Sequence, residues 1–386
     1  MNNTLILTDK AVLQMSQEIL HEHIKLEASG YKVQTTDLWH VLLGVAADRG
    51  TIESVCNKLL EGPKAESIRQ YIKGQLRAED LPQLEKGVNE ALVARLPKHL
   101  WRRGQDVAID FHDQPYYGKY PQEKALWVGD RAKASTTRFY RIATAYVLRK
   151  HMCYTLAVCF VEPATSVEKV LQKLCHHLKK LAVPLHCLLL DRGFAAIAAQ
   201  LFLEREALPA VIACPIRGKK GGTRALCTGR KSYRAQYTFD GRKGRKRVAE
   251  LAVCRVFTTA KRTGRLRRQV DWQIFVLINV DFSPKQVRRL YRRRFAIESS
   301  YRLANQVRGR TTSPNPAYRF LLMALGLILA NIWTYLRWRY TQRPRSGGRW
   351  LEVKEFQLDR FAQFVLLALQ HHYGYVHELT AIVAPL

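Results

Sequence analysis

The sequence predicts an α/β protein in which a sheet-forming core lies between two helical regions. Residues 9–98 show helical patterns with polar joints and no strand alternation, and the region 1–98 is expected to bind DNA. From Gln105 onward, strand-length apolar runs alternate with helical runs, which places the core at 99–340. The remaining residues, 341–386, are expected to form a helical tail. With 386 residues, the chain is long enough for two or three domains and a sizeable core.

The helical region contains one candidate DNA-reading unit. Residues 51–60 look helical, 61–63 (Glu-Gly-Pro) turn the chain, and 65–73 resume a helical pattern with basic and polar side chains. A helix, a tight turn and a second polar helix resemble a helix-turn-helix. Ordinary packing of two helices explains the pattern equally well, so both interpretations stay open.

The core begins with an ordered series of strands and helices. The strand-like runs are 105–112, 138–149, 151–161, 185–190 and 209–214, and the helical runs are 167–182 and 195–206. Three strands, a helix, a strand, a helix and a strand follow the order of an RNase H-like domain. The first and fourth strands are neighbours in that arrangement, about 4.8 Å apart. Asp110 on the first strand and Asp191 at the end of the fourth are therefore expected to meet.

A basic segment over 216–270 then interrupts the pattern. Between Arg217 and Arg247 there are twelve Lys or Arg residues and one acid, Asp240. Strand-like pieces at 232–239 and 248–257 predict a β-rich insertion that grips phosphates, whereas a disordered basic loop is the alternative. The candidate DNA-binding residues of the insertion are Arg242, Lys243, Arg245, Lys246 and Arg247.

Two further elements complete the core. A strand at 272–280 is followed by a helix that opens near Ser283-Pro284, where proline suits the first turn, and Glu298 is expected on that helix. Residues 320–336 are largely apolar and almost long enough to span a bilayer. Asn331 within this stretch and the flanking arginines favour a buried core helix over a membrane span.

The charge balance indicates a polyanionic partner. Lys and Arg number 63 against 32 acids, giving a net charge of +31, while 47% hydrophobic residues indicate a folded protein. Nucleic acid is the expected partner, with an anionic membrane surface or a merely solvated basic face as alternatives. Eight scattered cysteines without a Cys-x-x-Cys pair and no evident secretory signal favour a reducing, cytoplasmic location, associated with the nucleoid.

Three carboxylates stand out in this basic chain as candidate metal ligands: Asp110, Asp191 and Glu298. Phosphodiester cleavage needs an activated water and charge stabilisation at the leaving oxygen, and two Mg²⁺ ions about 3.5–4 Å apart supply both. Mg²⁺ prefers hard oxygen ligands such as carboxylates. The three acids are therefore expected to be catalytic residues and metal ligands, with Mn²⁺ as a possible substitute ion.

Each acid also has a simpler interpretation. Asp191 could serve merely as the cap of the turn that follows it. Asp113, three residues after Asp110, is an alternative candidate for the first acid of the site. Glu298 is flanked at four-residue spacing by Arg294 and Arg302, so helix ion pairs could explain it. His112, two residues after Asp110, is expected to be a surface histidine.

Tyr291-x-x-Arg294-x-x-x-Glu298 is similar to the Tyr-Arg-Glu-Lys signature of insertion-sequence DDE transposases. The sequences around the first two acids, from 108 to 118 and from 189 to 194, also resemble that family, as do residues 301–313. The resemblance covers roughly residues 100–340. It departs at one point, because the signature lysine seven residues after the glutamate is Asn305 here.

The resemblance implies an RNase H-like catalytic core with a β-rich insertion, Mg²⁺ dependence, and a homodimer acting on double-stranded DNA at transposon ends and at the target. It also implies that Tyr291 and Arg294 contact DNA near the scissile phosphate. Arg302 or Arg308 would take the role of the missing lysine. The expected function is that of a DNA transposase, with a metal-dependent nuclease lacking strand transfer and a catalytically silent DNA-binding protein as alternatives.

Overall fold

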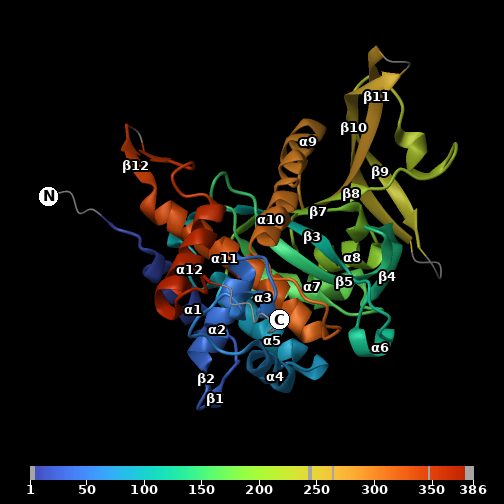
Figure 1. Cartoon of the computed structure of the whole chain (residues 1–386). Coiled ribbons are helices and arrows are strands. Elements are labelled where there is room, and N and C mark those ends of the chain that lie inside the picture. The colour runs from blue at the N-terminus through green and yellow to red at the C-terminus, as the bar shows by residue number, and fades with distance from the viewer. Residues whose placement is uncertain (1–4, 242–245, 263–264, 347, 379–386) are drawn as a thin grey trace.

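A mixed sheet runs through the middle of the molecule, and helices pack on both of its faces (Figure 1). The computed structural model describes residues 5–241, 246–262, 265–346 and 348–378. The α/β fold class predicted from the sequence is confirmed.

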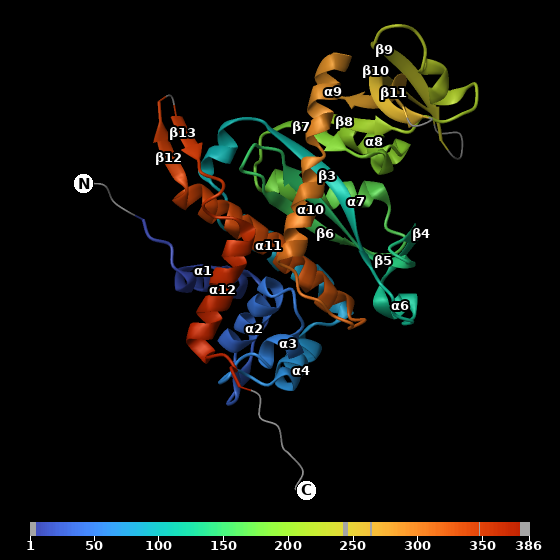
Figure 2. The ribbon, with the colours of Figure 1, turned by 45° about the horizontal axis from the view of Figure 1, so that its top comes forward.

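The two ends of the chain form one helical body with a shared core. Its helices are α1 (Asp9–His23), α2 (Thr35–Ala47), α3 (Ile52–Cys56), α4 (Ala65–Gln75), α5 (Leu81–Val93), α11 (Pro316–Tyr340) and α12 (Leu358–Tyr373). Near the end of the chain, α12 lies against α1 and α2 (Figure 2). The hydroxyl of Tyr373 bonds to Asp37 of α2 at 2.6 Å and to His40 at 3.0 Å, which fixes this contact.

Two small ribbons in the helical body were not expected from the sequence. They are β1 (Ser29–Gly30) with β2 (Val33–Gln34), and β12 (Gln342–Arg345) with β13 (Gly348–Leu351). The helix expected over 51–60 ends at Cys56, so the link to α4 is longer than the roughly 3–4-residue turn of a helix-turn-helix. The structure thus favours ordinary helix packing here.

The sheet order is β4-β5-β3-β7-β8-β11-β10-β9, with β6 paired to β5. The strands are β3 (Gln105–Pro115), β4 (Val128–Lys133), β5 (Thr136–Val147), β6 (Thr155–Val161), β7 (Leu185–Leu190), β8 (Ala210–Cys214), β9 (Tyr233–Asp240), β10 (Lys246–Arg262) and β11 (Arg265–Ile278). The expected neighbours β3 and β7 do pair, in parallel, with Ile109 opposite Leu190. The five strands predicted between 105 and 214 are all present; β4 and the short α6 (Gln122–Ala125) were not foreseen.

Helices cover the two faces of the sheet differently. On β3, Val107 and Ile109 face the core shared with α7 (Val167–Lys180) and α8 (Ile197–Arg205). Side chains of a strand alternate between faces, and Ala108 accordingly faces α9 (Pro284–Arg293) and α10 (Ala296–Gln306). The helical body covers the same face as α9 and α10 farther along, at β5 and β6.

The basic insertion is β-rich, as expected, and it continues the main sheet rather than forming a separate unit. Residues 274–278 of β11 pair with 210–214 of β8, and β10 and β9 follow outward. The β10–β11 hairpin then projects beyond the rest of the sheet (Figure 1). The disordered-loop alternative does not hold for the described part of the insertion.

The long apolar stretch forms α11, which is long and apolar enough to span a membrane. In its most apolar 18-residue stretch, however, 89% is buried inside the protein. It therefore serves as the core helix that was expected. Asn331 on α11 accepts from the amide of Thr155 at 3.0 Å and donates to the carbonyls of Thr155 and Leu92. In the same way Asn89 of α5 bonds the amide and carbonyl of Val158. The outer edge of β6 is thus bonded by side chains instead of by another strand.

One boundary differs from the expectation. The helix that opens at Ser283 ends at Arg293, and Glu298 lies in the first turn of a second helix, α10. At the joint the amide of Ile297 bonds the carbonyl of Arg294, and the amide of Glu298 bonds that of Phe295. These are the short three-residue steps of a tightened turn. The placement of Glu298 on the α9 helix was wrong.

Candidate active site

Asp110 and Asp191 come together at the point where β7 ends. The parallel pairing of Ile109 with Leu190 puts the next residue of each strand side by side. The two carboxylates are close enough for Asp191 to raise the pKa of Asp110. Sequence positions 81 apart thus share one site, as the strand order predicted.

The carboxylate of Asp110 is held on both oxygens. Its Oδ1 accepts from the amide of Phe111 at 2.9 Å, and its Oδ2 accepts from Nη1 of Arg294 at 2.8 Å. Its side chain is 14% exposed. Burial raises the pKa of Asp110 above its usual range, the cation of Arg294 opposes this shift, and Asp191 adds to it. A desolvated acid beside a second acid is an electrostatic arrangement that a cation relieves.

Asp191 forms the capping contact that was its simpler interpretation. Its Oδ1 accepts from the amide of Gly193 in the short 3₁₀ turn Arg192–Phe194. This contact uses one carboxylate oxygen, and within the described residues the other makes no hydrogen bond. Capping and metal binding are therefore compatible at Asp191.

Arg294 and Tyr291 approach this acid pair from the end of α9. Arg294 is 6% exposed, and its buried Nε has no hydrogen-bond partner among the described residues. The hydroxyl of Tyr291 donates to the carbonyl of Leu190 at 3.2 Å, and burial raises its pKa to about 12. Both signature side chains therefore contact the strand ends that carry the two aspartates.

Glu298 is exposed and does not make the helix ion pairs that were its simpler interpretation. Arg294 pairs with Asp110 instead, and Arg302 donates to Ser299 at 3.0 Å. In the sequence, Glu298 lies between Arg294 and Tyr301, and both of these residues contact Asp110. In the part of the chain that the structure describes, no three His, Cys, Asp or Glu side chains form a metal-binding group. The structure thus joins two of the three predicted acids, whereas Glu298, in the first turn of α10, is not part of a three-acid group among the described residues.

Tyr301 is a site residue to which the sequence gave no role. Its hydroxyl donates to the backbone carbonyl of Asp110 at 3.0 Å and bonds Thr144 at 2.7 Å. Its ring stacks on His112 with centroids 4.4 Å apart. His112, expected at the surface, is half-buried, and burial lowers its pKa to about 4. Tyr301 lay within the segment that resembles the transposase signature, which is the signal that could have identified it.

The competing acid, Asp113, is fully engaged elsewhere. Arg141 bonds both of its oxygens, at 2.6 and 3.0 Å, and Lys133 adds a third contact. Hydrogen bonds from Arg141, supported by the cation of Lys133, outweigh burial and lower the pKa of Asp113. Asp113 is therefore a structural ion-pair residue, and Asp110 is the acid at the site.

The predicted DNA-binding cations have different surroundings. Arg302 and Lys246 are exposed, whereas Arg308 is half-buried and burial lowers its pKa. Arg247 was wrongly expected to face DNA: it is 7% exposed and bonds Gln200 at 2.5 Å and Glu204 of α8. The remaining three, Arg242, Lys243 and Arg245, lie outside the described residues.

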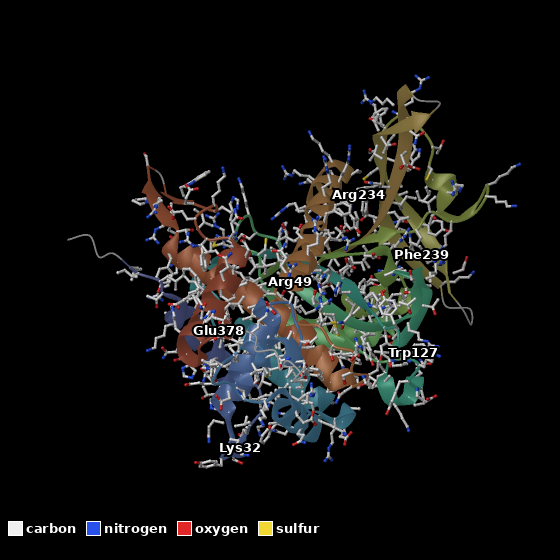
Figure 3. All side chains as sticks on the ribbon, in the orientation of Figure 1. Lys32, Arg49, Trp127, Arg234, Phe239 and Glu378 are labelled. Atoms are coloured by element: carbon white, nitrogen blue, oxygen red, sulfur yellow. The ribbon has the colours of Figure 1, made fainter. Side chains whose placement is uncertain are left out.

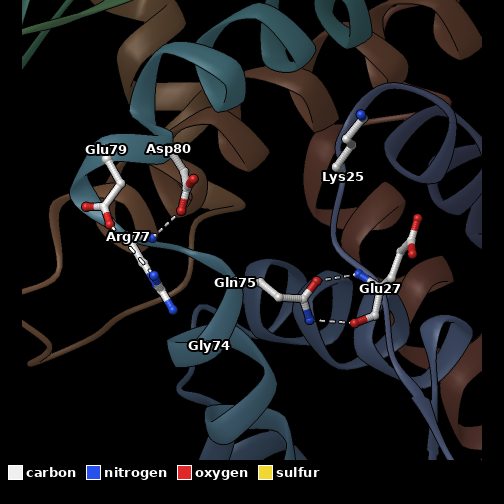
Figure 4. A pocket seen from close by; sticks show the side chains of 7 residues that line it. All are labelled: Lys25, Glu27, Gly74, Gln75, Arg77, Glu79 and Asp80. Carbon is white, nitrogen blue, oxygen red and sulfur yellow. Dashed lines mark hydrogen bonds and ion pairs between the residues drawn. The ribbon is translucent and has the colours of Figure 1, made fainter.

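A hollow of about 400 Å³ in the helical body is not part of this site (Figure 4). Its three acids, Glu27, Glu79 and Asp80, outnumber its two cations, Lys25 and Arg77, by one, so it carries only a small net charge. The amide of Gln75 crosses it to bond the backbone of Glu27. We therefore regard this hollow as a structural feature.

No protein-family model matches the sequence, and no curated protein matches it either. The fold is similar to that of piggyBac transposase in the cryo-EM structure of its synaptic complex with hairpin DNA. The TM-score is 0.53 at 10% sequence identity, and the similarity covers 94% of this chain and 76% of the other. At this identity the similarity establishes a shared fold, and the activity has to be argued from the side chains.

Proposed function

We propose that this chain is a DNA transposase of the insertion-sequence DDE type with an RNase H-like catalytic core. The observation that carries the proposal is the meeting of Asp110 and Asp191 beside the buried guanidinium of Arg294. The strand arrangement β6-β5-β3-β7-β8 and the fold similarity to piggyBac transposase support the same assignment. The net charge of +31 suits a DNA substrate.

The acids at this site fit a magnesium centre. Asp110 and Asp191 offer hard carboxylate oxygens, and proteins commonly hold Mg²⁺ by one or two carboxylates together with substrate phosphate. Glu298 is the proposed third ligand, and Mn²⁺ is expected to substitute. When bound, two such ions would supply activation of water and charge stabilisation at the leaving oxygen.

The protein's own side chains then have distinct tasks. Tyr301 fixes the backbone of β3 at Asp110, and Arg294 orients the carboxylate. In the proposed reaction, water attack at the element's end frees a 3′-hydroxyl, which then attacks target DNA. Tyr291 and Arg294 would lie next to the scissile phosphate while held against the strand ends by their contacts with Leu190 and Asp110. Arg302 or Arg308 would take the place of the signature lysine. The protein would act as a homodimer on double-stranded DNA, in the cytoplasm at the nucleoid.

The experiment that tests this proposal is an incubation of the purified protein with Mg²⁺ and linear DNA bearing the element's flanking ends. Strand cleavage at the ends and covalent joining to a second DNA are the expected products. Cleavage without joining would favour a nuclease, and DNA binding without cleavage would favour a catalytically silent relative. The variant Asp191→Asn is the matched control, because it keeps the size of the side chain and removes the charge.

A further inference from the structure

A second basic surface lies on α9, away from the two aspartates. A hollow of about 620 Å³ runs along this helix and is lined by Ser232, Pro284, Lys285, Arg288, Arg289 and Arg292. We call it the α9 groove. Figures 1 and 2 show α9 standing clear of the helical body, beside the base of the β-rich insertion. No residue of this lining is acidic.

The helix is two-sided, and its outer side carries unmatched charge. Val287 and Leu290 are buried against the sheet. Lys285, Arg288, Arg289 and Arg292 lie on the other side, and none of them makes an ion pair among the described residues. Like charges three and four positions apart destabilise a helix, so the arrangement is costly without an anionic partner.

Neighbouring cations show that acids are available to this region but are used elsewhere. Arg293, the next residue along, pairs with Asp106. Arg234, labelled in Figure 3 near the same helix, is bonded to both Glu250 and Asp281. The four cations of the α9 groove are therefore left free by the fold itself, which suits an external polyanion.

The helix that carries the groove leads to Arg294, which contacts Asp110. From Lys285 to Arg294 the helix and its joint advance about 14 Å, at roughly 1.5 Å per residue. A DNA strand presents one phosphate per roughly 3.4 Å of helix axis, so this length matches about four phosphates. Arg294, at the end of the series, is bonded to Asp110.

We propose that the α9 groove binds about four consecutive phosphates of the DNA strand that enters the site at Asp110 and Asp191. This inference rests on the proposed function and adds the path by which its substrate reaches the acids. The contacts are to phosphates, so they fix the register and direction of the strand and do not read its sequence.

The salt dependence of DNA binding tests the inference without requiring cleavage. Binding of a short linear duplex is measured by fluorescence anisotropy in EDTA, from about 50 to 200 mM KCl. The quadruple variant Lys285→Gln, Arg288→Gln, Arg289→Gln, Arg292→Gln should lower the slope of log K against log salt by about 3.6, since each neutralised phosphate contributes about 0.9. A charge-preserving variant, Arg288→Lys, Arg289→Lys, Arg292→Lys, should keep the wild-type slope.

The matched control removes four exposed lysines from other parts of the surface, two of them on α7 across the sheet: Lys10→Gln, Lys32→Gln, Lys169→Gln and Lys180→Gln. This variant should lower the slope by less than about 1.

An equal loss in the control, or an unchanged slope in the α9 variant, overturns the inference while leaving the proposed function standing. A wild-type protein that does not bind DNA would instead refute the proposed function. Loss of binding to anionic phosphatidylglycerol vesicles with an unchanged DNA slope would assign the groove to a membrane and also overturn the inference.

Discussion

Nη1 of Arg294 donates a 2.8 Å hydrogen bond to Oδ2 of Asp110, 184 positions earlier in the chain. The preceding residue, Arg293, pairs with Asp106, four residues before Asp110 on the same strand. Two consecutive arginines at the end of α9 thus hold two aspartates of β3. This double contact fixes the joint between α9 and α10, and with it the starting point of the helix that carries Glu298.

The first prediction concerns the three acids. Asp110→Asn, Asp191→Asn and Glu298→Gln should each abolish Mg²⁺-dependent cleavage of end-bearing DNA, because each removes a charged oxygen ligand. DNA binding measured in EDTA should stay within about twofold of wild type, a change of roughly 0.4 kcal/mol. Asp113→Asn is the control and should retain cleavage, although the loss of its ion pairs with Arg141 and Lys133 should lower the thermal stability. Persistent cleavage by Asp191→Asn would remove the site assignment.

The second prediction concerns the geometry of Arg294. Arg294→Lys keeps the charge but loses the planar fork that reaches Asp110, and a lysine ammonium is a poor replacement in such a position. We expect cleavage at least tenfold slower than wild type, a barrier increase of about 1.4 kcal/mol. Single-turnover rates provide the measurement, with the exposed Arg102→Lys as the control. Wild-type rates in Arg294→Lys would mean that the Asp110 contact is purely structural.

The third prediction is a pH dependence. The pKa of Asp110 is raised by burial and by Asp191 despite the opposing cation of Arg294. At limiting Mg²⁺, where the ion has to displace the proton from Asp110, cleavage should therefore decline with falling pH at a point above the usual aspartate value of about 3.9. Removing the cation in Arg294→Gln should move this decline to still higher pH.

The pH dependence expected for folding stability is opposite in sign to that expected for cleavage. A raised pKa means that the folded state binds the proton more tightly than the unfolded chain does. The stabilising contribution of Asp110 is therefore fully present below the unfolded pKa and is lost as the pH rises through the folded one. Cleavage rates and melting temperatures across about pH 4 to 8 check both signs. Superimposable rate profiles for wild type and Arg294→Gln would contradict the electrostatic account.

The fourth prediction separates two neighbours in the insertion. Arg247 is buried against Gln200 and Glu204, so Arg247→Gln should lower the free energy of unfolding by about 1–2 kcal/mol, as expected for lost buried hydrogen bonds. The salt dependence of DNA binding should be the same in Arg247→Gln as in the wild type. Lys246→Gln, at the exposed neighbour, should leave urea unfolding unchanged. A lowered salt slope in Arg247→Gln at normal stability would restore Arg247 as a DNA contact.

The sequence predicted the sheet elements well because their signals are local. The apolar runs that end at Asp110 and Asp191 are short and regular, and the order of strands and helices was enough to make β3 and β7 neighbours. By contrast, the break before Glu298 follows from the contacts of Arg293 and Arg294 with β3, which no local pattern contains. Arg247 was misplaced for the same reason, since its partners lie on α8, more than 40 positions earlier.

The bonding at the edge of β6 has a mechanical consequence. Exposed strand edges are where further strands add, and here Asn89 and Asn331 occupy the backbone groups that such a strand would need. Sliding the helical body along the sheet would break several buried hydrogen bonds at once, so we expect the body and the sheet to move together. We therefore expect any rearrangement that accompanies DNA loading on the opposite flank, in the β10–β11 hairpin, which projects beyond the rest of the sheet.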